Sequence, residues 1–433
     1  MRSITFLGPP EGRGAPLSES GVSRHATATA ERFFGSSPVA ASGIGTVHVI
    51  RAADFLGAAW LRGGERALPH TLPEVRVAAN AWVGNGGAST NEMLARMDVM
   101  LVRDGVVFVA GLNNSPPDMP LMTGAWNVLG VGTVRAGHVG SNLGPRAVGP
   151  ARPRLVAPGG TTSAATPVVA SAAAMLMETA DRIPQPAIRR LAARPETVIA
   201  TLLASAVRVN EYRGGWSDAP VLAGPERGRN GSPLDPGVGA GTLDVDAAHL
   251  ILSTPPANPG SVIGGEGWTI LPPAIDEQRW LLEVTEPVDV IATLVWFRAP
   301  VAPVPAADGN DGADADGEAP ARSGGLRLAD LGLEIVAREA GPNGGLVDRS
   351  LVGRDPAARG ANFLGGSVAS DAAESSVEGL RATGLQPGRY ALRVTRKNAD
   401  AGRPLASLAW IIRPAAAPDA PQGQPLGRRV PPP

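Results

Sequence analysis

Ser163 is the residue of this chain whose setting most clearly suggests chemistry, because it lies between a Gly/Thr turn and an alanine-rich segment. A serine hydroxyl is a weak nucleophile at neutral pH, so it needs a base within hydrogen-bond reach and donors for a developing oxyanion. A helix that begins at Ser163 would bring first-turn N–H groups and the positive end of its dipole close to Oγ. We place Pro167 still in the first turn, where a missing N–H costs little. The alternative is that Thr162 or Ser163 only caps the helix.

The pattern Thr-Ser-x-Ala-x-Pro at residues 162–167 resembles the nucleophile motif of the subtilisin-like serine peptidases, the subtilases. The resemblance implies that Ser163 is the nucleophile. Thr161 stands where the family usually has glycine. The order of further polar residues along the chain supports the same family.

A pair of amides ends the segment at residues 104–114, which reads as a buried parallel strand running into a glycine turn. In the subtilases such a turn delivers an asparagine to the oxyanion hole, where an amide donates a hydrogen bond without carrying a charge. We favour Asn113 for this role and keep Asn114 as the second choice, because Leu112 intervenes in the usual Ala-Gly-Asn pattern. An ordinary Asn-Asn turn is the alternative.

His25 begins a small-residue helix that is followed by a predicted strand at residues 45–51. This arrangement resembles the subtilase motif of the general base, although Ala26 replaces the usual glycine. A histidine before a helix is more often a cap or a surface group. The resemblance implies that His25 is the base, since His25, Asn113 and Ser163 occur in family order.

Residues 75–84 resemble the edge of the subtilase substrate cleft, where an extended peptide pairs with the enzyme backbone as an added strand. Ala81, Trp82 and Val83 would line this cleft. Ala81 stands where the family commonly has serine. A plain buried strand with a packing tryptophan is the alternative.

The third member of the triad is missing from its expected place, because the first aspartate of the chain is Asp54, well after His25. In the subtilases this aspartate lies on a strand before the histidine and fixes its tautomer. Only Glu11 and Glu19 precede His25, in a Gly/Pro/Ser-rich stretch that is not typical of a strand. Either the first strand is absent from this sequence, or the chain is a degenerate subtilase. Residues 1–23 show no secretory signal pattern.

Composition favours a large secreted or envelope bacterial protein, and the resemblance implies an extracellular or envelope location. The 433 residues allow two or three domains. A net charge of −1 suggests neither a nucleic-acid nor a membrane partner. The absence of cysteine excludes disulfides and thiolate chemistry. No cofactor is indicated, and the oligomeric state cannot be inferred.

Residues 1–253 form the first predicted domain, and the resemblance covers most of residues 24–253. Apolar strands at residues 47–50, 75–79, 106–109 and 128–131 alternate with helix-like stretches. This alternation predicts an α/β fold, a subtilisin-like and mostly parallel sheet with helices on both faces. Helices are predicted at residues 195–206 and near the end of 237–252.

A linker at residues 254–261 leads to an all-β domain over residues 262–414. Period-two runs at residues 280–286, 288–296, 331–336 and 389–394 predict a β-sandwich. Their order resembles the jelly-roll domain that follows the catalytic domain of many subtilases. Residues 308–318 carry clustered carboxylates faintly like a calcium loop, but a solvated acidic loop fits better. The Pro-rich tail, residues 415–433, is predicted to be disordered.

The sequence thus predicts a serine endopeptidase that acts on polypeptides through an acyl-enzyme. Ser163 would attack the peptide carbonyl, His25 would take and return the proton, and Asn113 with the Ser163 N–H would hold the oxyanion. The alternative is a pseudoprotease that binds peptides or acts as a scaffold. In a third possibility the sandwich is the functional binding module and the first domain its carrier.

Overall fold

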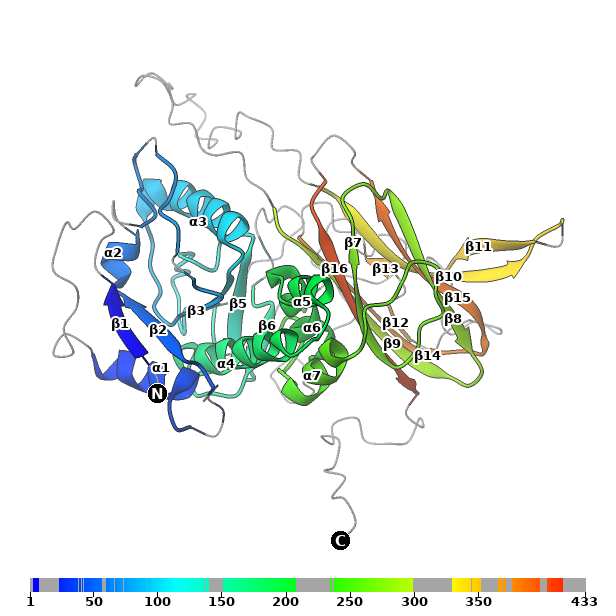
Figure 1. Cartoon of the computed structure of the whole chain (residues 1–433), viewed down its shortest axis with the longest axis horizontal. Coiled ribbons are helices and arrows are strands. Elements are labelled where there is room, and N and C mark those ends of the chain that lie inside the picture. The colour runs from blue at the N-terminus through cyan, green and yellow to red at the C-terminus, as the bar shows by residue number, and fades with distance from the viewer. Residues whose placement is uncertain are drawn as a thin grey trace, which may run out of the picture.

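The computed structural model describes residues 3–7, 23–207, 234–298, 329–351, 365–397 and 403–415, with short gaps at 38, 40, 42, 57–59, 66, 73, 136, 140–149, 151, 236, 344, 368 and 371–375. The carboxylate cluster at 308–318, Glu11, Glu19 and residues 416–433 lie outside the described residues. The chain forms an α/β domain followed by an antiparallel β-sandwich, as predicted (Figure 1).

A four-stranded parallel sheet, in the order β3-β4-β5-β6, is the centre of the first domain. Its strands are β3 (Val77–Asn80), β4 (Val107–Gly111), β5 (Val128–Thr133) and β6 (Leu155–Ala157). Every residue of β4, β5 and β6 is buried, which explains why these strands read as continuous apolar runs rather than as alternating ones.

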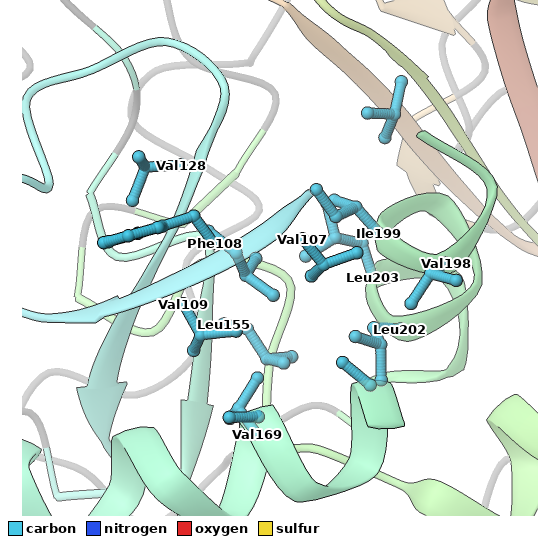
Figure 2. Packing of buried hydrophobic residues seen from close by; sticks show 14 of the residues in the cluster. Val107, Phe108, Val109, Val128, Leu155, Val169, Val198, Ile199, Leu202 and Leu203 are labelled. Carbon is cyan, nitrogen blue, oxygen red and sulfur yellow. The ribbon is translucent and has the colours of Figure 1, made fainter. Parts of the chain in front are cut away.

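Helices cover both faces of this sheet. Helix α3 (Thr90–Asp104) leads from β3 to β4 and lies on the opposite side of the sheet from α4 (Thr162–Asp181) in the view of Figure 1. In Figure 2, Val109 of β4 and Leu155 of β6 lie near Val169 of α4. The end of β4 meets the start of α4, because the Thr162 hydroxyl bonds to the carbonyl of Leu112, which follows β4; sites form at such carboxyl ends in open α/β sheets.

The remaining elements of the first domain are α1 (Arg24–Phe34), β2 (Thr46–Ile50), α2 (Ala52–Leu56), the short 3-10 turn η2 (Gly87–Ser89), α5 (Pro186–Ala192), α6 (Pro195–Ser205) and α7 (Val245–Ser253).

A strand does precede His25. Strand β1 (Ser3–Leu7) pairs in parallel with β2, from Ser3 opposite Thr46 to Leu7 opposite Ile50. Within the described residues it belongs to a two-stranded sheet with β2 and not to the four-stranded parallel sheet, so it does not decide between the two explanations for the missing aspartate. The strand carries Ser3, Ile4, Thr5, Phe6 and Leu7, so it brings no carboxylate.

Helix α4 begins one residue earlier than predicted, with Thr162 as its first residue and Thr161 as its N-cap. Pro167 is consequently the sixth residue and lies in the second turn, which corrects the placement in the first turn. Because proline has no N–H, the carbonyl of Ser163 receives no helical hydrogen bond from position 167. One turn back, the Thr166 hydroxyl donates to the Thr162 carbonyl at 2.8 Å.

The second domain consists of two antiparallel sheets. One has the order β11-β10-β15-β8, with β13 also paired to β10, and the other has the order β12-β14-β9-β16-β7. The strands are β7 (Glu266–Leu271), β8 (Glu277–Val284), β9 (Val288–Trp296), β10 (Leu331–Ala340), β11 (Leu346–Ser350), β12 (Gly365–Ser367), β13 (Ala369–Ser370), β14 (Val377–Leu385), β15 (Gly388–Arg396) and β16 (Ala406–Pro414).

The second of these sheets has apolar residues on both faces. Along β9, Ala292, Leu294 and Trp296 enter the core between the two sheets, whereas Ile291 and Val295 join the core of the first domain. Successive side chains of a strand point to opposite faces, so one strand serves both cores.

Helix α6 fills the space between the parallel sheet and the sandwich. All eleven of its residues are buried. In Figure 2, Ile199 and Leu203 lie beside Val107 of β4. A polar contact also joins α6 to the sandwich: the Thr197 hydroxyl lies 2.9 Å from the Ser407 hydroxyl of β16. The hydrophobic core of the first domain thus includes residues of the sandwich, which has a second core between its own two sheets.

Candidate active site

Ser163 lies at the carboxyl end of the parallel sheet as the second residue of α4. Its hydroxyl donates a hydrogen bond to the backbone carbonyl of Ala81, just beyond β3, at 3.2 Å. The N-cap of the helix is Thr161, and the Thr162 hydroxyl donates to the Leu112 carbonyl at 2.6 Å. Neither Thr162 nor Ser163 therefore acts as the cap, and the Ser163 hydroxyl bonds to the segment that was predicted to line a substrate cleft.

His25 reaches the same carbonyl from another element. It is the second residue of α1, whose N-cap Ser23 accepts from the Ala26 N–H at 3.1 Å. Its Nε2 lies 3.0 Å from the oxygen of Ala81. A carbonyl oxygen only accepts hydrogen bonds, so Nε2 carries the proton in this arrangement. His25 is exposed to solvent.

The meeting at Ala81 fixes how near the two side chains are. Because His25 Nε2 and Ser163 Oγ both bond to one oxygen atom, they lie no farther apart than the two bonds laid end to end. Their contact with each other is indirect, through that carbonyl. The predicted nucleophile and the predicted base are thus brought together by segments 56 and 82 residues away from Ala81.

In this arrangement His25 Nε2 and Ser163 Oγ are both hydrogen-bond donors to the Ala81 carbonyl. A base that accepts the Ser163 proton must present a lone pair at Nε2, which requires the proton to be on Nδ1. In a complete triad a carboxylate accepts from Nδ1–H and holds that tautomer. Among the residues described, none bonds to His25 Nδ1. The nearest aspartate in sequence, Asp54, is paired with Arg51 at 2.7 Å.

The two candidate amides point in different directions. The Nδ2 group of Asn113 donates to the carbonyls of Ser115 at 2.6 Å and Pro117 at 2.7 Å, so both of its protons are used within its own turn. The Oδ1 atom of Asn114 accepts from the backbone N–H of Thr162 at 2.9 Å and lies 3.3 Å from its hydroxyl. The contacts therefore favour Asn114, the second choice, over Asn113.

Donors for an oxyanion are present at the start of α4. The N–H groups of Ala164 and Ala165 already bond to the Thr161 carbonyl at 3.0 and 3.1 Å. The N–H of Ser163 has no acceptor among the described residues, as is usual for the first turn of a helix. The Nδ2 of Asn114 also has no acceptor there. A negative charge at this point would also lie at the positive end of the helix dipole.

The predicted cleft edge leaves β3 and runs past the two side chains. The carbonyl of Trp82 accepts from Asn80 Nδ2 at 3.1 Å, and Val83 is 38% exposed. Beyond it, Gly84 forms an antiparallel bridge with Leu121, whose N–H donates to the Gly84 carbonyl at 3.1 Å. Leu121, which the sequence analysis did not single out, therefore pairs with the predicted cleft edge from the loop between β4 and β5.

The structure adds little on metals and membranes. Within the residues that the structure describes, no three His, Cys, Asp or Glu side chains are grouped so that they could hold a metal ion. A search of the described helices finds none that is both long and apolar enough for a membrane span.

Comparison with known proteins gives a family match within the first domain. Residues 56–239 match the model of the subtilase family, a span that includes Ala81, Asn114 and Ser163 and begins after His25. No curated protein sequence matches the chain.

Several solved structures resemble the chain at low identity. A protease from Pseudoalteromonas arctica is 16% identical with a TM-score of 0.29, and the similarity covers 49% of this chain and 64% of that one. A serine protease of Aeromonas sobria is 14% identical with a TM-score of 0.29, covering 85% and 77%. MycP1 without its N-terminal propeptide is 17% identical with a TM-score of 0.31, covering 57% and 90%. Because these TM-scores are low, the similarity to the subtilase family depends on the match of residues 56–239 to the family model.

Proposed function

Since residues 56–239 of this chain belong to the subtilase family of serine peptidases, we propose that the first domain binds polypeptides and hydrolyses them slowly as an endopeptidase. The observation that carries the proposal is the meeting of His25 Nε2 and Ser163 Oγ at the carbonyl of Ala81. Two chemically complementary side chains from distant segments share one atom at the carboxyl end of a parallel sheet, which is the expected place for a site.

Each step of the reaction has a residue to perform it. Ser163 Oγ attacks the scissile carbonyl, and its proton passes to His25 Nε2, which later gives it to the leaving amine. The Ser163 N–H and Asn114 Nδ2 donate to the oxyanion. The backbone at residues 81–83 binds the extended substrate. Water then hydrolyses the acyl-enzyme by the same proton transfers in reverse order.

The rate is expected to be low because His25 must first change its tautomer. The proton on Nε2 has to leave and another must reside on Nδ1, where no carboxylate holds it. Loss of the correct tautomer costs about 10⁴-fold in turnover in triad proteases. An oxyanion hole and bound substrate still give about 10³–10⁴-fold over water without a working triad.

The second candidate is a peptide-binding pseudoprotease, which the double donation to Ala81 favours. In that function the cleft edge and the start of α4 hold a peptide, and the hydroxyl of Ser163 stays bonded to the backbone. The peptide would then be released uncut.

Labelling with a fluorophosphonate tests the proposal on the full chain. We expect slow covalent labelling of the wild type, lost in Ser163→Ala and strongly reduced in His25→Ala. Ser171→Ala is the matched control, because this serine lies on the same helix and donates to the Val39 carbonyl at 2.6 Å, on another segment. Folded wild-type protein that stays unlabelled, yet binds unstructured peptides in fluorescence anisotropy, would establish the pseudoprotease instead.

A further inference from the structure

The loop between β4 and β5, residues 112–127, is held at its far end by the β-sandwich. Asn127 is fully buried, and its side chain makes a reciprocal pair with the backbone of Arg298, which follows β9. Asn127 Nδ2 donates to the Arg298 carbonyl, and the Arg298 N–H donates to Asn127 Oδ1, both at 2.8 Å. One amide side chain thus binds the two domains together through two hydrogen bonds.

The side chains of Arg298 and Ser376, in the second domain, also contact Trp126. The guanidinium carbon of Arg298 lies 3.3 Å from the centre of the Trp126 ring, a cation-π contact. The Ser376 hydroxyl donates to the Trp126 carbonyl at 3.2 Å and accepts from Arg154 Nη2 at 2.8 Å. Arg298 and Ser376 are 4% and 1% exposed, so water cannot easily replace the bonds that they make.

The first domain holds the same two residues from the opposite side. The carboxylate of Asp98, on α3, accepts from the Trp126 N–H at 3.0 Å and from the Asn127 N–H at 2.8 Å. The end of the loop is therefore clamped between α3 and the sandwich. Five residues before this clamp, Leu121 bonds to Gly84 at the cleft edge.

We propose that Arg298 and Ser376 are positioning residues for the peptide cleft, which makes the sandwich a structural part of the site. Their side chains hold Trp126, and this contact keeps Leu121 against Gly84, so that residues 81–84 are extended and available to a peptide. Neither residue touches Ser163 or His25. The effect is therefore on peptide binding and leaves the reactivity of Ser163 unchanged. The proposal rests on the proposed function for its consequence, although its structural step does not.

The test compares two ways of weakening the same domain junction. The double variant Arg298→Met with Ser376→Ala removes the cation-π contact and the hydroxyl bond to Trp126. The control Ser407→Ala removes the interdomain hydrogen bond to Thr197, which lies on α6 and away from the loop. The double variant removes two buried contacts of the junction and the control removes one, but only the double variant affects the loop.

Hydrogen exchange at the Leu121 amide is the direct readout. We expect about tenfold faster exchange in the double variant and no change in Ser407→Ala, since the loss of one or two net hydrogen bonds has about this effect on a local opening equilibrium. Equal exchange in all three proteins, or an equal increase in both variants, would overturn the proposal.

Ligand binding gives the second readout and separates the two proposals. We expect the double variant to bind peptides several-fold more weakly than wild type while a small fluorophosphonate labels Ser163 at the wild-type rate. Labelling that slows as much as peptide binding would overturn the positioning role. Wild-type protein that neither binds peptide nor reacts would defeat the proposed function, and the exchange at Leu121 would still decide the structural step.

Discussion

The carbonyl of Ala81 determines the resting state of the site. It accepts from both His25 and Ser163, so each of the two neighbours presents a proton to it. Catalysis needs one of them to present a lone pair. No described residue stabilises a proton on Nδ1 of His25. The tautomer with the proton on Nε2 is therefore set by the carbonyl oxygen of Ala81, a backbone atom that any residue type would supply. No sequence pattern could have indicated this contact.

Asn113 and Asn114 differ in what their amides already bond. We expect Asn114→Ala to slow fluorophosphonate labelling of Ser163 by about 10²-fold, the effect of losing one oxyanion donor. Asn113→Ala should leave the labelling rate within a few-fold, because its protons serve the carbonyls of Ser115 and Pro117. Pseudo-first-order labelling rates measure both. A larger loss in Asn113→Ala would return the oxyanion role to Asn113.

Asp98 makes stability depend on pH. Burial raises its pKa to about 7, although the N–H groups of Asn127 and Trp126 and the charges of Arg154 and Arg298 oppose this. Between about pH 4 and 7 the folded protein therefore binds more protons at Asp98 than the unfolded chain does. The free energy of unfolding of the wild type falls over this range as pH rises, and the loss is complete above about pH 7. We expect Asp98→Asn to be more stable relative to wild type at pH 8 than at pH 5, measured as the difference between their free energies of unfolding. Urea unfolding at both values measures it, and a difference that is constant or reversed refutes the assignment.

At the level of elements, the close approach of α4 to the end of β4 sets the position of Ser163. Gly111 ends β4 where a β-carbon would lie 2.6 Å from Thr166 Oγ1 and 3.4 Å from Thr162. Only glycine lets the start of the helix sit this near the strand. The same approach brings the Thr162 hydroxyl to the Leu112 carbonyl.

Gly111→Ala should push the first turns of α4 away from β4. Overpacking of this kind costs about 1–3 kcal/mol, and we expect the labelling of Ser163 to slow as well because the helix start moves relative to Ala81. Gly160→Ala is the matched control, since a β-carbon at that position meets no atom within 4 Å. Thermal unfolding and labelling rates measure the two effects. A labelling rate unchanged in Gly111→Ala would show that the site tolerates this movement.

Elements with strong periodicity were predictable and those set by tertiary contact were not. The run at residues 288–296 predicted β9 to the residue and the segment after Pro195 predicted α6, because period-two alternation and helical spacing after a proline are local features of the sequence. Strand β1 escaped notice because it is five residues long and partly exposed. The choice between Asn113 and Asn114 depends on how one turn points each side chain, and the grip on Trp126 depends on a residue 171 positions after Asn127.

The whole molecule unfolds, we expect, as one unit, because α6 is covered on both sides. Strands β9 and β16 contribute Ile291, Val295 and Ile411 to the core of the first domain. This shared core argues against a sandwich that works alone as a binding module on an inert carrier. It also means that the hydrophobic energy of either domain depends on the other.

Ile199→Ala tests this coupling. The variant should lose about 2–5 kcal/mol of unfolding free energy, as for other buried Ile-to-Ala changes, and should still show a single transition by calorimetry. Leu250→Ala on α7 is the control, because Leu250 is 55% exposed and its loss should change stability by about 0.5 kcal/mol or less. Two separate transitions in Ile199→Ala would show that the domains fold independently.

The complete enclosure of α6 also limits how its sequence can drift. An enlarged side chain on one flank displaces the helix toward the other neighbour, so a tolerated change should arrive with a compensating one in β4, β9 or β16. In relatives of this chain we expect substitutions in α6 to be accompanied by substitutions in the parallel sheet or in the sheet with β9 and β16. A larger side chain in one of these elements should be offset by a smaller one in its neighbour.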